Sequence, residues 1–104
     1  MKDSSLREEK ARILKALAHP TRLLFVESLA NGELCVCELN ALIDADVSTV
    51  SKHLSVLKNA GIVSCEKRGL QVYYNLKVPC VLNFMGCIQG VLENGLRERR
   101  DLLK

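Results

Sequence analysis

Residues 47–76 read VSTVSKHLSVLKNAGIVSCEKRGLQVYYNL, and the pattern of this stretch predicts the central elements of the fold. Within 47–60 the apolar side chains recur every three or four residues, which predicts a helix with one narrow apolar stripe. The stripe consists of Val47, Val50, Leu54 and Leu57, and the other positions are mostly small or polar. Residues 62–67 and 71–76 alternate around Arg68-Gly69-Leu70, which predicts a β-hairpin. We therefore expect a polar-faced helix followed directly by a hairpin.

Further helices flank this stretch on both sides. They are expected over 5–18, over about 20–31, from Cys35 onward with Val36, Leu39, Leu42 and Ile43 inward, and over 79–103. Pro20 separates the first two helices, because the residue before a proline is pushed out of the α region. Asp46 or Ser48 can accept hydrogen bonds from the free N–H groups at the start of the polar-faced helix.

The order helix, helix, short helix, polar-faced helix, hairpin, helix is that of a winged helix-turn-helix domain. We therefore predict a mostly helical fold with a β-hairpin wing and element order α-α-α-α-β-β-α. The chain has 104 residues, which is too few for two separate cores, so a single domain over 1–104 is expected. A content of 48% hydrophobic and 26% charged residues is ordinary for a globular protein and excludes a disordered chain.

Charge is distributed unevenly along the sequence. Residues 27–46 carry five acidic residues and no basic one, whereas residues 47–77 carry five basic residues and one acidic one. The chain as a whole has a formal net charge of +3. A basic central segment favours a polyanionic partner such as nucleic acid, and the alternative is a solvated basic face.

The polar-faced helix suits a DNA major groove, because most of its circumference is free to enter the groove. The hairpin tip would lie along the flanking backbone or minor groove. The predicted contacts to double-stranded DNA are Ser48, Thr49, Ser51, Lys52, His53, Ser55, Lys58, Lys67 and Arg68. The alternative is a small helical domain whose polar faces meet only water.

Four segments resemble the ArsR/SmtB family of bacterial metal-responsive repressors, namely Ala18–Leu23, Glu33–Leu39, Ser48–Leu54 and Leu57–Val63. The resemblance covers about residues 6–95, and the Cys-Val-Cys pair at 35–37 is similar to the arsenic-binding branch in particular. It implies a homodimer that is joined mainly by the first and last helices and binds a palindromic operator. It further implies that an inducer releases the DNA. Two-fold symmetry fits a palindrome, since a dimer doubles the contacts of one short protomer.

Five cysteines, an odd number in a chain without a secretion signal, favour free thiols over a disulfide framework. In a regular helix Cys35 and Cys37 would point about 200° apart, so both could hold one ion only if the first turn unwinds. Soft ions such as As(III), Sb(III) or Bi(III) prefer thiolates. We hypothesise that capture of such an ion distorts the turn that positions the DNA-reading helix.

The sequence does not show which residue would supply a third thiolate ligand. Arsenic-binding relatives of this type often place it three residues after the second cysteine, and that position is Asn40 here. Either a solvent molecule or small thiol completes the site, or Cys80, Cys87 or Cys65 joins it. Cys80 and Cys87 lie about 10 Å apart along one helical face, so each would join a site from another element, including one across the dimer. The alternatives are two buried cysteines in the dimer seam and a structural Cys65.

The candidate metal ligands are thus Cys35, Cys37, Cys80 and Cys87. Cd(II) and Pb(II) remain possible inducers, as soft ions. The zinc sensors of the family that this chain resembles use Asp, His and Glu pairs on the last helix. Residues 79–104 contain no histidine, so zinc sensing through such a site is not expected. Thiol-redox or persulfide sensing on the same scaffold is the other alternative.

Other functional classes find little support in the sequence. No motif pairs a nucleophile with a base and no glycine-rich phosphate loop occurs, so neither an enzyme nor an organic cofactor is expected. No apolar run approaches the ~20 residues that cross a bilayer, and the N-terminus lacks an apolar signal region. A cytoplasmic protein without a membrane partner is therefore expected.

Overall fold

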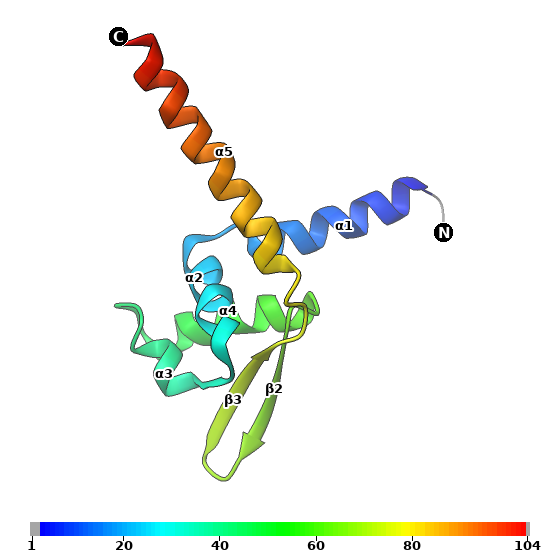
Figure 1. Ribbon diagram of the computed structural model, residues 1–104. Helices are drawn as coiled ribbons and strands as arrows, with labels where there is room; N and C mark the ends of the chain where they lie inside the picture. The colour runs from blue at the N-terminus through cyan, green and yellow to red at the C-terminus, as the bar shows by residue number, and fades with distance from the viewer. Residues whose placement is uncertain (1–2, 104) are drawn as a thin grey trace.

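The structure is a computed structural model that describes residues 3–103, and it confirms the winged helix-turn-helix fold (Figure 1). The elements in chain order are α1 (Asp3–Leu17), α2 (Pro20–Ser28), the 3₁₀ helix η1 (Leu29–Asn31), β1 (Leu34–Cys35), α3 (Val36–Asn40), α4 (Val47–Asn59), β2 (Val63–Arg68), β3 (Gln71–Leu76) and α5 (Val81–Leu102). Helices α2, α3 and α4 form the body, the β2–β3 hairpin projects from it, and α1 and α5 extend away from it.

Capping residues start the helices of the body where the sequence predicts. Pro20 stands in the first turn of α2, and His19 precedes it in extended conformation. The Nδ1 atom of His19 accepts a hydrogen bond from the Thr21 N–H at 3.1 Å. At the start of α4 a carboxylate oxygen of Asp46 accepts from the Thr49 N–H at 2.8 Å, which confirms the predicted cap.

The sheet has three antiparallel strands in the order β1-β3-β2, one more than the sequence predicts. The additional strand, β1, pairs Leu34 with Tyr74 and Cys35 with Tyr73. Gly69 turns the hairpin with a φ of +62°, which an L side chain rarely adopts. Strand β1 therefore attaches the segment before α3 to the hairpin.

The hydrophobic core lies between α2, α3, α4 and β2. Its fully buried side chains are Phe25, Val26, Leu39, Val50, Leu54, Leu57, Ile62 and Val63. Two predicted inward positions are wrong: Val47 is 60% exposed and Leu42 is 44% exposed. Val47 is the first residue of α4, and Leu42 lies in the turn after α3 has ended.

The two terminal helices carry apolar side chains that the protomer does not bury. Helix α5 has no buried residue at all, although it is 22 residues long. Its exposed large apolar residues include Phe84, Ile88, Val91, Leu92 and Leu96, and those of α1 are Leu6, Ile13 and Leu14. The radius of gyration is 16.5 Å, whereas a compact chain of this length reaches about 13 Å. Among residues 3–103, no helix has the length and apolar character that crossing a membrane requires.

Candidate nucleic-acid interface and thiol site

Helix α4 presents a polar outer face. Its buried stripe consists of Val50, Leu54 and Leu57, which anchor the helix on the core. Six of the predicted contact residues are exposed on the remaining surface, namely Ser48, Thr49, Ser51, Lys52, Ser55 and Lys58. These side chains offer hydroxyl and ammonium groups, which can hydrogen-bond base edges and phosphates.

His53 is the exception on α4, because its half-buried ring is held inside the domain. Its Nδ1 atom lies 3.1 Å from Nη1 of Arg22, and its ring centroid lies 4.3 Å from that of His19. Arginine can only donate, so Nδ1 of His53 accepts and the ring is neutral. Burial, and secondarily the charges of His19 and Arg22, lower the pKa of His53. His53 therefore joins α4 to the α1–α2 junction.

Arg22 is a residue that the sequence reasoning did not single out. Its Nε donates to the Ala16 carbonyl at 2.6 Å, and its Nη2 donates to the Lys15 carbonyl at 3.5 Å. Together with the contact to His53, these bonds connect the end of α1 to α4. The available signal was the segment Ala18–Leu23, in which Arg22 follows His-Pro-Thr.

The wing carries two predicted DNA contacts, in different situations. Lys67 is exposed. The guanidinium of Arg68 forms an ion pair with the carboxylate of Glu33. Its Nε also lies 3.7 Å from a carboxylate oxygen of Glu66, and its carbon Cζ lies 4.2 Å from the centre of the Tyr73 ring. The hydrogen bond from Arg68 lowers the pKa of Glu33, so this pair remains charged near neutral pH.

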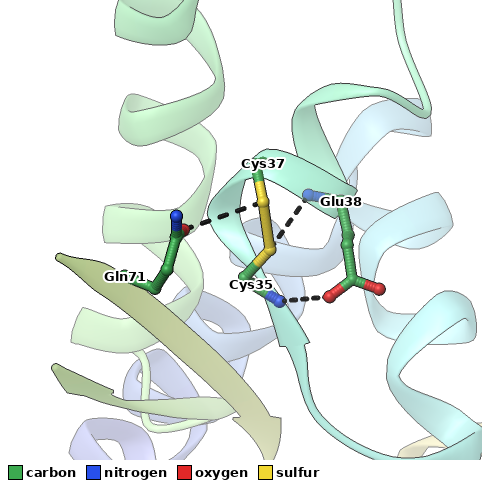
Figure 2. The surroundings of a disulfide bond; sticks show 4 residues. All are labelled: Cys35, Cys37, Glu38 and Gln71. Carbon is green, nitrogen blue, oxygen red and sulfur yellow. Dashed lines mark hydrogen bonds between the residues drawn. A yellow bond between two sulfur atoms is a disulfide. The ribbon is translucent and has the colours of Figure 1, made fainter. Parts of the chain in front are cut away.

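The structure joins Cys35 and Cys37 as a disulfide at the start of α3 (Figure 2). Cys35 is buried and lies before the helix, with φ −78° and ψ 163°. Its Sγ accepts from the Glu38 N–H at 3.4 Å, and a Glu38 carboxylate oxygen accepts from the Cys35 N–H at 3.1 Å. Cys37 is exposed, and its Sγ lies 3.7 Å from Oε1 of Gln71 on β3.

This geometry corrects the argument that the two sulfurs need an unwound turn to meet. That argument assumed that both residues belong to a regular helix. Cys35 instead has extended backbone angles, and the two Cα atoms lie 5.4 Å apart with the sulfurs already in contact. Bound to one another as a disulfide, the two cysteines are not free thiols, contrary to the expectation from their odd number.

The remaining cysteines lie elsewhere. Cys80 and Cys87 are exposed, at the start and on the first half of α5, and are not buried within the protomer. Cys65 is half-buried on β2 opposite Tyr74. No group of three or more histidine, cysteine, aspartate or glutamate residues that could hold a metal occurs within residues 3–103. Of the four predicted ligands, Cys35 and Cys37 therefore lie together as a disulfide, and Cys80 and Cys87 lie on a different element.

Comparisons with known proteins agree with this architecture. A family model described as "Bacterial regulatory protein, arsR family" matches residues 19–64. A cadmium resistance transcriptional regulatory protein CadC of Listeria innocua is 44% identical over 72 residues, which are 68% of this chain and 60% of that protein. An uncharacterised HTH-type transcriptional regulator of Methanocaldococcus jannaschii is 43% identical over 68 residues, which are 64% of this chain and 76% of that protein.

The solved structures include a homodimeric winged helix-turn-helix DNA-binding domain of Mycobacterium bovis, described as a possible ArsR-family transcriptional regulator. It has a TM-score of 0.77 and 29% sequence identity, and the match covers 94% of this chain and 93% of that one. The chain spans about three-fifths of the length of the first curated relatives it matches. The matched family consists of regulatory proteins and not of enzymes. On these matches, the chain belongs to the ArsR family of bacterial regulatory proteins.

Proposed function

We propose that this chain is a homodimeric, DNA-binding transcriptional repressor that a thiophilic ion releases from its operator by binding to Cys35 and Cys37. The DNA-binding part rests on one observation above all. Helix α4 buries three apolar side chains and leaves six small or basic polar ones outside. In the proposed complex α4 enters the major groove, and Lys67 with Arg68 contacts the backbone beside it.

Dimerisation through α1 and α5 is supported by the apolar side chains that these helices leave exposed. A surface of this kind rarely stays open to water, because burying it is favourable. The homodimeric Mycobacterium bovis domain provides a relative of the same fold. A two-fold dimer would place two copies of α4 about 34 Å apart, one helical turn of DNA.

The inducer is proposed to be As(III) or Sb(III), with Cd(II) and Pb(II) as alternatives. Adjacent thiols are the donors that these ions prefer, and the relative CadC is named for cadmium resistance. Binding at Cys35 withdraws the sulfur that caps α3 at Glu38. Helix α3 packs against α4, so a change at its first turn acts on the DNA-reading helix. A third donor would come from a small thiol, or from Cys80 or Cys87 of either protomer.

The disulfide supports a second candidate function, thiol-redox sensing. In that case the thiols of Cys35 and Cys37 lose two protons and two electrons to a disulfide oxidant such as oxidised glutathione. The oxidant is reduced to two thiols, and the protein gains one S–S bond. The structure contains the product of this reaction, and metalloid binding requires the reduced pair.

The test is fluorescence anisotropy of reduced protein on its own upstream DNA at fixed salt. Arsenite, Cd(II), Zn(II) and oxidised glutathione are titrated separately. We expect release by arsenite and none by Zn(II). Release by the oxidant alone would favour the redox function, and absence of DNA binding would refute both.

Serine variants locate the site. Cys35→Ser and Cys37→Ser should each bind the operator like the wild type and no longer respond to arsenite. Cys65→Ser is the matched control and should respond normally, because Cys65 lies on β2 and strand β3 separates it from the pair. Normal release from either of the first two variants would show that the inducer binds elsewhere.

A further inference from the structure

The thiol pair is attached to the wing as well as to the helix-turn-helix. Cys35 pairs with Tyr73 in the β1–β3 ladder, and Cys37 lies against Gln71 on the same strand. Figure 2 shows the disulfide between the Gln71 side chain and Glu38. A change at this pair therefore reaches β3 directly, without passing through α4.

Glu33 extends this connection to a predicted DNA contact. It lies two residues before Cys35, directly ahead of β1, and its carboxylate binds the guanidinium of Arg68. Tyr73, the ladder partner of Cys35, lies under the same guanidinium. Arg68 is thus held by residues on both sides of the β1–β3 ladder.

The carboxylate of Glu33 can be replaced at Arg68 by another anion. The side chains are 44% and 37% exposed, and an ion pair at such a surface is weak enough for another anion to compete. A DNA phosphate beside the wing is such an anion, and arginine binds it in the same bidentate way as a carboxylate. While Glu33 is bound to the guanidinium, Arg68 does not make its predicted contact with a DNA phosphate.

We propose that Glu33 is a positioning residue that competes with a DNA phosphate for Arg68, and that the state of the Cys35–Cys37 pair decides this competition through β1. The inference rests on the proposed DNA-binding function. The β1–β3 pairing places Glu33 beside the wing, and the disulfide ties Cys35 on β1 to the first turn of α3. In the disulfide form Arg68 stays bound to Glu33, and in the reduced form Arg68 binds a DNA phosphate.

The salt dependence of operator binding tests this, because each phosphate contact adds about 0.9 to the slope of log K against log salt. In a dimer the reduced wild type should have a slope steeper than the disulfide form by about 2. Glu33→Gln should have the steep slope in both thiol states, and Arg68→Met the shallow slope in both. Thiol state is verified by mass spectrometry.

Glu66→Gln is the matched control, because it removes the same charge from the other carboxylate beside Arg68, which lies on β2 and is not attached to β1. It should keep the difference between the two thiol states. The inference would be overturned if Glu33→Gln had the same salt-dependence slope as the wild type in each thiol state. It would also be overturned if the slopes of the two thiol states still differed in Arg68→Met. Either result leaves the proposed function standing if the operator is still bound. A wild type that binds no operator defeats both.

Discussion

Replacement of Ile88 by aspartate should separate the dimer. Ile88 lies on α5 and is 46% exposed in the protomer. Complete burial of an isoleucine contributes about 1.5–3 kcal/mol, so the exposed part contributes about 1 kcal/mol per protomer and about 2 kcal/mol per dimer. That loss alone raises the dimer dissociation constant roughly 30-fold. Burying two unpaired carboxylates adds to it, so an increase beyond about 100-fold is expected.

Sedimentation equilibrium over a range of protein concentrations measures this constant. The control is Asn83→Asp, which adds the same charge about 140° around α5 from Ile88 and should leave the constant unchanged. Circular dichroism checks that both variants retain their helices. If the Ile88 variant dimerises within threefold of the wild type, α5 does not form the interface and the argument from its exposed residues fails.

Two further predictions concern α4. Leu54→Ala should lower the free energy of unfolding by about 2–5 kcal/mol, because Leu54 is fully buried. Val47→Ala should lower it by less than about 1 kcal/mol, because Val47 is 60% exposed. Urea denaturation measures both values, and equal losses would contradict the burial pattern. The pKa of His53 is lowered, so stability should be intact above the ordinary value of 6.5 and fall as the pH drops from there through the lowered pKa. His53→Gln keeps an acceptor for Arg22 and should reduce this fall in thermal midpoint between pH 7 and pH 5; an unchanged fall would place the titrating group elsewhere.

The helices and the hairpin could be predicted because their signals are local. The stripe of α4, the cap at Asp46 and the proline at the start of α2 each lie within a few residues of the feature they determine. Strand β1 could not be predicted, since two residues are too few to show alternation. Its existence depends on Tyr73 and Tyr74, almost forty residues further along the chain.

The sequence predicted which residues belong to the candidate site better than it predicted how they are arranged. The cysteine pair and the outer face of α4 are visible in the sequence. The structure places that face and Cys37 at the surface and buries Cys35. The prediction that the two sulfurs point apart was wrong, because the angle between the Cys35 and Cys37 side chains depends on which residue begins α3. Glu33, which pairs with Arg68, and Arg22, which contacts His53, each lie more than thirty residues from their partner, so no local pattern could predict these contacts.

The position of the disulfide also determines how little it constrains the chain. Cys35 and Cys37 are separated by two positions, so the bond closes a very short loop. In the chain-entropy relation, closing a three-residue loop stabilises a protein by roughly 1.5 kcal/mol, compared with about 3 kcal/mol for fifteen residues. Breaking the bond therefore costs the domain little of its folding stability. The same protein can exist folded in both thiol states, so a change of state can act as a signal without denaturing the molecule that carries it.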